Sequence, residues 1–383
     1  MSCSKILLGD LPEYNMSCSK ILLGDLPELT YEIIKYFQND YSNLLDYSTL
    51  HSCILVNRLW CRIAIPLLWE NPFSIPNRNY NKMIEIYLYN LNDDVKTKLN
   101  EYKIINNSLS SRNIMFNYVK FLKYLNICRY MFYVEKWSDD ATSTKHFEQN
   151  FMRLVHMSLF KIFIENGVNL RTLEIEIGTL DIHCYDYQNI LKLILQNQNF
   201  IHNIGNLQLN IVDNIENMVT NNHVLQIIHL HQNLKKIKIL INLIENIKQS
   251  LNYLSMIIWE EYPLTGSFIL KNLGQILPSK LEYLSLVLNV KESDFRAFLE
   301  NSQGVFVNKL SIELRRGSDD TLHYIKEYIM KEKRVKYLAI KDNENNKELF
   351  DLKEEVREFE LHNIRVRRHR DLFISDLSDF IWS

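Results

Sequence analysis

The segment Leu281-Glu282-Tyr283-Leu284-Ser285-Leu286-Val287-Leu288 carries the pattern that decides the fold. Apolar residues stand at its first, fourth and sixth positions, and the later ones alternate with other residues as in a short strand with one buried face. Because successive side chains of a strand point to opposite faces, Leu284 and Leu286 are expected to face the core. Tyr283 and Ser285 are then expected to lie exposed on the opposite face.

The same apolar-x-x-apolar-x-apolar pattern recurs along the chain. Its copies begin at Leu122, Leu170, Ile204, Leu234, Leu251, Leu281, Val307, Val335 and Val356. Helical patterns lie between many of the copies, for example over residues 190–195, 268–277 and 322–329. Strands that alternate with helices at this spacing pair in parallel through right-handed crossovers. We therefore predict an α/β fold, a right-handed β/α solenoid over residues 119–383 with a curved parallel sheet.

Two short helical patterns precede this region. The first, Thr30 to Gln38, places Leu29, Ile33 and Phe37 on one face and follows Pro27, a residue suited to a helix start. The second, Ser48 to Cys61, predicts a single helix with apolar residues at every third or fourth position. A module of about fifty residues cannot bury so many large apolar side chains alone. Some of them must contact the rest of the chain or another protein.

This region resembles the F-box pattern, and the match rests on Leu26-Pro27-Glu28, Ile33, Phe37, Leu50, Cys53 and Val56-Asn57-Arg58-Leu59-Trp60. The continuation from Pro66 to Phe73 is similar to that of many fungal F-box proteins. The resemblance implies docking on the Skp-family adaptor, and through it the cullin, of a ubiquitin ligase. The residues implied in adaptor binding are Leu26, Pro27, Leu29, Ile33, Phe37, Leu50, Val56 and Trp60. The repeated region resembles the irregular leucine-rich repeats that follow many F-boxes, although the Asn or Cys expected after each strand is mostly missing.

These patterns divide the chain into four predicted regions. Residues 1–20 are a duplicated leader without a structural role, because Met1–Glu13 is identical to Met16–Glu28 and only the second copy continues into a helical pattern. The alternative is that Leu11-Pro12 of the first copy competes for the same groove. Residues 21–75 form the F-box, residues 76–118 a helical linker, and residues 119–383 the leucine-rich-repeat-like solenoid.

Composition excludes several classes of function. The net charge of −2 gives no overall bias towards nucleic acid or membrane. The nine glycines form no phosphate-binding loop, and the six cysteines form no C-x-x-C pair. With no membrane-length apolar stretch, we expect a soluble cytoplasmic or nuclear protein with reduced thiols. We expect no catalytic residue, metal site or cofactor, and neither a nucleic-acid nor a membrane partner.

The residues between the apolar strand positions are predicted to line the concave face. They are Thr172, Glu174, Glu176, Asn206, Gln208, Asn210, Lys236, Lys238, Tyr283, Ser285, Lys309, Ser311, Glu313, Tyr337 and Lys341. As contacts for a target protein we select Glu174, Glu176, Gln208, Lys236, Lys238, Tyr283, Lys309 and Tyr337. The alternative is a merely solvated face. The run Arg365 to Arg370 has the residues to bind an acidic or phosphorylated peptide, but a solvated loop is the favoured interpretation.

The sequence thus favours a non-catalytic substrate receptor of a Skp-cullin-F-box type ubiquitin ligase, with the solenoid holding a target protein. The alternative is a scaffold or regulatory protein in which the solenoid binds a partner and the F-box-like segment only caps its end. An enzyme is the weakest interpretation, since no catalytic motif supports it.

Overall fold

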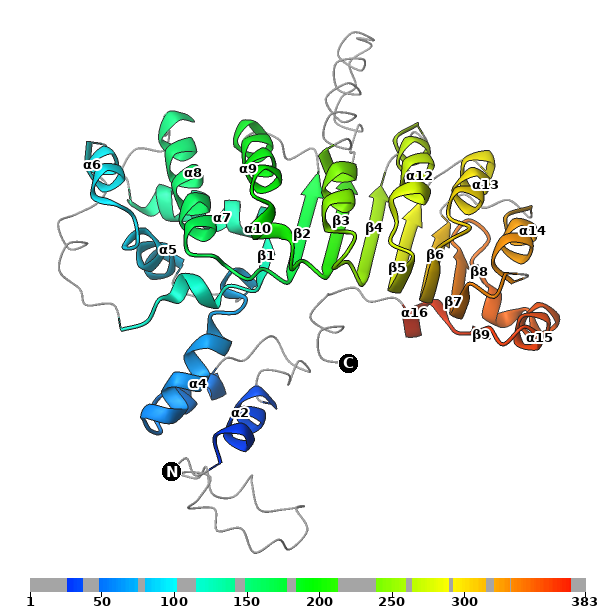
Figure 1. The fold of residues 1–383 in the computed structure, drawn as a ribbon, viewed down its shortest axis with the longest axis horizontal. Coiled ribbons are helices and arrows are strands. Elements are labelled where there is room, and N and C mark those ends of the chain that lie inside the picture. Colours follow the sequence, from blue (N-terminus) through cyan, green and yellow to red (C-terminus); the bar gives the residue numbers. More distant parts are fainter. Residues whose placement is uncertain are drawn as a thin grey trace, which may run out of the picture. The chain divides into compact units, whose positions relative to one another are not determined.

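The computed structural model describes residues 26–36, 48–74, 80–101, 115–141, 149–177, 184–212, 239–259, 264–288, 292–314, 320–330 and 332–372. The chain divides into two compact units, Met1–Pro76 and Asn77–Ser383. Figure 1 shows the elements of both units, which are described separately below.

The first unit is helical. Its elements are α2 (Pro27–Tyr36), α3 (Ser48–Ile54), α4 (Arg58–Leu68) and the short 3-10 turn η1 (Pro72–Ser74). Pro27 is the first residue of α2, where its missing N–H costs no hydrogen bond. The Thr30 hydroxyl donates to the carbonyl of Leu26 at 2.9 Å, which links the first turn of the helix to the residue before it. Helix α4 packs against both α2 and α3.

The single helix predicted from Ser48 to Cys61 is wrong, because the chain turns between α3 and α4. Asn57 causes the break: its side-chain oxygen accepts a hydrogen bond from the Trp60 N–H at 2.9 Å and caps the start of α4. The turn leaves Leu55 and Val56 exposed between the two helices.

The second unit contains a nine-stranded, mostly parallel open sheet. Its strands are β1 (Tyr124–Asn126), β2 (Thr172–Ile177), β3 (Asn206–Val212), β4 (Tyr253–Trp259), β5 (Lys280–Leu288), β6 (Phe306–Leu314), β7 (Val335–Asp342), β8 (Lys347–Glu348) and β9 (Arg365–Val366). Strands β1 to β7 lie side by side in chain order, as Figure 1 shows. On the edge of β7 away from β6, two short strands pair with it. The first half of β7 pairs with β9 in parallel, and its second half pairs with β8 antiparallel. The predicted α/β fold with a parallel sheet is therefore confirmed.

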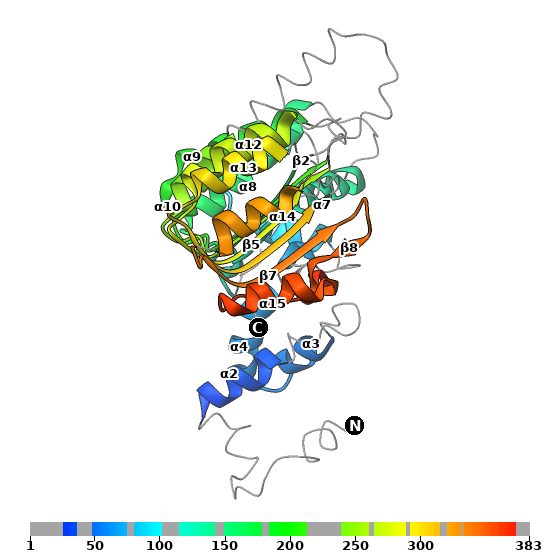
Figure 2. The ribbon, with the colours of Figure 1, turned by 90° about the vertical axis from the view of Figure 1, so that its right-hand side faces the viewer.

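Helices connect most of the strands. They include α5 (Tyr80–Leu88), α6 (Asp93–Glu101), α7 (Ile127–Ala141), α8 (Gln149–Glu165), α9 (Cys184–Gln196), α10 (Gln198–Ile201), α12 (Leu264–Ile276), α13 (Glu292–Asn301), α14 (Asp320–Ile325), α15 (Lys353–Leu361) and α16 (His369–Leu372). Short helical turns are η3 (Tyr118–Phe121), the π-helical η6 (Lys326–Met330) and η7 (Leu349–Asp351). Figure 2 shows α8, α9, α12 and α13 along one face of the sheet and α15 on the opposite side.

The core lies between the sheet and this layer of helices. The strand side chains that point to the helices form the helix face of the sheet, and all are buried: Leu173, Ile175, Leu207, Leu209, Leu254, Met256, Leu284, Leu286, Leu310, Ile312, Leu338 and Ile340. These are the apolar positions of the recurring pattern, so the predicted inward register is confirmed at these strands.

Two of the nine predicted strands are wrong. Part of the copy that begins at Leu234 lies outside the described residues, but residues 239–247 form a helix. Its buried residues Leu240, Leu243, Ile244 and Ile247 follow helical spacing, which prevails over the alternation of Ile237, Ile239 and Ile241. The copy at Val356 is helix α15, whose first turn carries Glu354 and Glu355, favourable charges at a helix N-terminus.

Candidate functional site

The sheet carries a second face, opposite the helices, which we call the polar face. The strand register aligns its side chains in rows that cross the sheet from strand to strand. The first row is Tyr124, Thr172, Asn206, Tyr253, Tyr283, Lys309, Tyr337 and Arg365. The second row is Asn126, Glu174, Gln208, Ser255, Ser285, Ser311 and Ala339. The predicted target-binding residues of β2, β3, β5, β6 and β7 thus share one face.

The centre of the polar face is buried, which corrects the predicted exposure of Tyr283. Its ring stacks on that of Tyr253 with the centroids 4.6 Å apart, and its hydroxyl donates to the carbonyl of Leu372 at 2.7 Å. Helix α16, which contains Leu372, packs against β6 and β7. Thr172, Gln208, Ser285 and Ser311, also predicted to be exposed, are buried as well. The chain's own C-terminal segment covers part of the surface that strand alternation alone leaves open.

Three serines lie side by side in the second row. Ser255, Ser285 and Ser311 pair in register on β4, β5 and β6, and their buried hydroxyls have no hydrogen-bond partner among the described residues. A buried hydroxyl without a partner costs free energy relative to one in water. The small serine side chains leave the Tyr253 and Tyr283 rings as the bulkiest groups at the centre of this face.

The β1–β2 end of the polar face is acidic. The Tyr124 hydroxyl donates to the Glu174 carboxylate, and Glu176 lies on the same face two residues further along β2. Burial, and after it the neighbouring Glu174 carboxylate, raise the pKa of Glu176 above its ordinary value, while Arg129 lowers it. This end can therefore accept hydrogen bonds or attract cations.

The first row ends in basic residues on β6 and β9. Lys309 is paired in register with Tyr337, which is paired with Arg365 on β9. The guanidinium carbons of Arg365 and Arg367 lie 5.8 and 5.9 Å from the centroid of the Tyr337 ring. The Lys336 ammonium lies 5.4 Å from the same centroid. Cationic groups therefore surround the Tyr337 ring, and this arrangement can bind an anion.

Arg365 and Arg367 are not among the predicted target contacts, because a solvated loop is the favoured interpretation of the run Arg365 to Arg370 and peptide binding is its alternative. A signal was present in the alternation Ile364-Arg365-Val366-Arg367. Ile364 and Val366 are buried, whereas both arginines are exposed, as expected of a strand with one solvent-facing side.

A buried histidine anchors α16 near this end. His369 Nε2 lies 3.5 Å from Glu313 Oε2, and the His369 N–H donates to Glu348 Oε2 at 3.1 Å. Burial lowers the pKa of His369 below its ordinary value, Lys341 lowers it further, and Glu313 and Glu348 oppose the shift. Near neutral pH this favours an uncharged ring.

The predicted adaptor-binding residues of the first unit fall into two groups. Leu50 and Trp60 are buried within the described structure, where they hold the helices together. Pro27, Leu29 and Val56 are exposed, and Leu26 and Ile33 are half-buried. The buried positions of α2 are Thr30 and Ile34, so the predicted stripe of Leu29 and Ile33 stays at the surface of the helix. Leu55, which the sequence reasoning did not select, is also exposed.

Three predicted site residues, Phe37, Lys236 and Lys238, lie outside the described residues. The described ranges contain no group of three or more His, Cys, Asp or Glu side chains placed to hold a metal ion. Among the same residues, no helix combines the length and apolar character needed to cross a membrane. Comparisons with known protein families, curated proteins and solved structures find no match to this chain.

Proposed function

We propose that this chain is the substrate-recognition subunit of a Skp-cullin-F-box type ubiquitin ligase. In this role the first unit docks on the Skp-family adaptor, and the second unit holds the target protein for ubiquitin transfer by other subunits. In this role the chain binds both partners and leaves catalysis to those other subunits.

The observation that carries this proposal is the apolar surface of the small helical unit. Leu29 on α2 is 36% exposed, and Leu55 and Val56 in the turn before α4 are 85% and 47% exposed. These side chains belong to the segment that resembles the F-box, next to Leu26 and Pro27. Exposed apolar side chains on a surface of short helices are typical of a protein contact site.

A leucine-rich-repeat-like solenoid is the architecture that we propose for the sheet unit. The connections into successive strands support it, because they repeat the same main-chain hydrogen bonds. The Lys123 carbonyl accepts from the N–H groups of Arg171 and Thr172, and the Arg171 carbonyl accepts from those of Gly205 and Asn206. The carbonyls of Gly205 and Asn252 repeat this arrangement at β4 and β5. Stacked repeats require such a regular contact between each repeat and the next.

The alternative role, in which the F-box-like segment only caps a scaffold, is less well supported. A solenoid end needs a cap because its terminal core is otherwise open. Here helix α7 packs against β1 and β2, and α5 and α6 pack against α7 and α8. Because the second unit supplies its own helices at the β1 end, capping does not account for the apolar surface of the first unit.

The docking proposal is tested by capture of the purified full chain on a Skp-family adaptor bound to its cullin. The double variant Leu29→Asp/Val56→Asp introduces charges at two exposed sites, so folding should be retained. We expect its capture to fall by at least about tenfold, because charges at the centre of an apolar contact are costly.

Leu361→Asp is the matched control, since Leu361 of α15 is an equally apolar residue that is 83% exposed in the second unit. Its capture should equal that of the wild-type chain. Undiminished capture of the folded double variant, or no capture of the wild-type chain, would contradict docking through this surface.

A further inference from the structure

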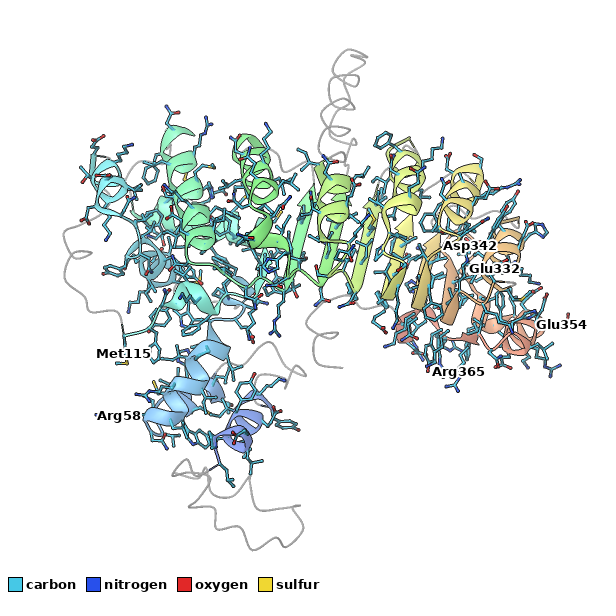
Figure 3. The ribbon with its side chains drawn as sticks, in the orientation of Figure 1. Arg58, Met115, Glu332, Asp342, Glu354 and Arg365 are labelled. Atoms are coloured by element: carbon cyan, nitrogen blue, oxygen red, sulfur yellow. The ribbon has the colours of Figure 1, made fainter. Side chains whose placement is uncertain are left out.

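The structure separates the cations between residues 365 and 370 into two pairs with different surroundings. Arg368 lies over the Phe350 ring at 4.7 Å and forms an ion pair with Asp351 at 3.5 Å. Arg370 pairs with Asp371 at 3.5 Å. Arg365 and Arg367, in contrast, both turn to the Tyr337 ring. Figure 3 shows Arg365 at the β9 end of the sheet, with its side chain directed away from the ribbon.

Three cations, Lys336, Arg365 and Arg367, lie within 5.9 Å of the centroid of the Tyr337 ring. Lys309 is the residue paired with Tyr337 in the register of β6 and β7, and we call these four basic residues the Tyr337 cluster. Within the described part of the chain, none of the four forms an ion pair with a carboxylate. Like charges at this spacing repel one another, and the electron-rich face of the tyrosine ring offsets only part of that repulsion. Excess positive charge therefore remains at one point of a chain whose net charge is −2.

The backbone holds this cluster in place. Arg365 is part of β9, which pairs with β7, and the Arg367 N–H donates to the Leu338 carbonyl at 2.8 Å. Lys309 and Tyr337 are paired within the parallel ladder between β6 and β7. Since the strands fix the positions from which the cations project, less entropy is lost when an anion binds than for a free loop.

We propose that the Tyr337 cluster binds a phosphorylated serine or threonine of the target protein. This inference rests on the proposed function and names the signal that the receptor recognises. A phosphate group carries a charge of about −1.5 to −2 and three acceptor oxygens, which match several converging cations better than one carboxylate does. Guanidinium groups provide the forked donors that bind phosphate oxygens in pairs.

A nucleic acid fits the surroundings less well than a phosphorylated peptide. Nucleic-acid binding commonly engages about 6 to 10 phosphates along an extended basic surface. The Tyr337 cluster is instead a single point, and the same end of the sheet carries Glu313, Glu348 and Asp351. These carboxylates would repel a continuous polyanion but leave room for one phosphate group.

The test uses the full chain and a fluorescent degenerate peptide library with one central phosphoserine. Identical libraries with serine or glutamate at that position, and a single-stranded oligonucleotide, are the comparison probes. We expect the wild-type chain to bind the phosphoserine library at least about tenfold more tightly than the other peptide libraries. The variant Arg365→Gln/Arg367→Gln should lose this preference.

The matched control is Arg368→Gln/Arg370→Gln, which also removes two positive charges from the run between residues 365 and 370. It should keep the phosphoserine preference within about twofold, because both of its arginines already have carboxylate partners. Equal binding of the three libraries, equal losses in both double variants, or tighter binding of the oligonucleotide would each overturn the proposal.

Adaptor capture separates this inference from the proposed function. If adaptor capture succeeds and the phosphoserine preference is absent, only the Tyr337 cluster proposal fails. If the preference is present and adaptor capture fails, only the ligase role fails. Adaptor capture of Arg365→Gln/Arg367→Gln should match that of the wild-type chain, because both substitutions lie in the second unit. An unchanged thermal unfolding transition of this variant confirms that its second unit folds.

Discussion

Strand β5 presents two faces whose side chains are equally buried but differ in chemistry. On the helix face, Leu284 and Leu286 pack among apolar side chains of the core. On the polar face, Tyr283 stacks on Tyr253 and donates to the Leu372 carbonyl, while the hydroxyl of Ser285 has no hydrogen-bond partner in the described part of the chain. Burial alone therefore does not distinguish the two faces. They differ because the polar face buries hydroxyl groups, whereas the helix face buries apolar side chains.

The largest effect is expected on the helix face. Leu284→Ala removes most of a buried side chain and should lower the free energy of unfolding by roughly 2 to 5 kcal/mol, measured by chemical denaturation. The loss combines the transfer free energy of the deleted methyl groups with the cavity that they leave. A cost below about 1 kcal/mol would show that Leu284 does not face the core.

An intermediate effect is expected where α16 meets the polar face. Tyr283→Phe keeps the stacked ring but leaves the Leu372 carbonyl without its donor, so stability should fall by about 0.5 to 1.5 kcal/mol in the same measurement. Tyr324→Phe is the control, because the Tyr324 ring lies under Arg296 while its hydroxyl makes no hydrogen bond within the described structure. Equal effects of the two variants would argue against the contact between Tyr283 and α16.

The smallest effect is expected at the serine row. Ser285→Ala deletes a buried hydroxyl for which the described ranges offer no partner, so the free energy of unfolding should fall by no more than about 0.5 kcal/mol, or increase. Ser250→Ala is the matched comparison, because the Ser250 hydroxyl donates to the Ile204 carbonyl at 2.9 Å. It should cost about 1 kcal/mol. If Ser285→Ala were the more costly variant, the Ser285 hydroxyl would make a stabilising hydrogen bond, contrary to its geometry in the structure.

Local sequence determined the direction of the strand side chains. At β2 to β7 the alternation of leucine and isoleucine with polar residues correctly predicted which side chains face the helices, because strand geometry repeats every two residues. The pattern misled at Leu234 and Val356, where apolar residues fit both strand and helix spacing over a short run. In the first unit, one side-chain cap at Asn57 divided the helix predicted from Ser48 to Cys61.

Only the tertiary structure decided what covers and surrounds the polar face. Tyr283 is buried because it bonds to Leu372, which is 89 residues away in the chain. The guanidinium groups of Arg365 and Arg367 lie near the Tyr337 ring because β9 pairs with the edge of β7. Such pairings depend on how distant segments close on one another in space, and no local periodicity records them. The sequence alone therefore determined the two faces of the sheet. The folded chain decided that one of them is partly covered and carries, at one end, cations that form no ion pair with a described carboxylate.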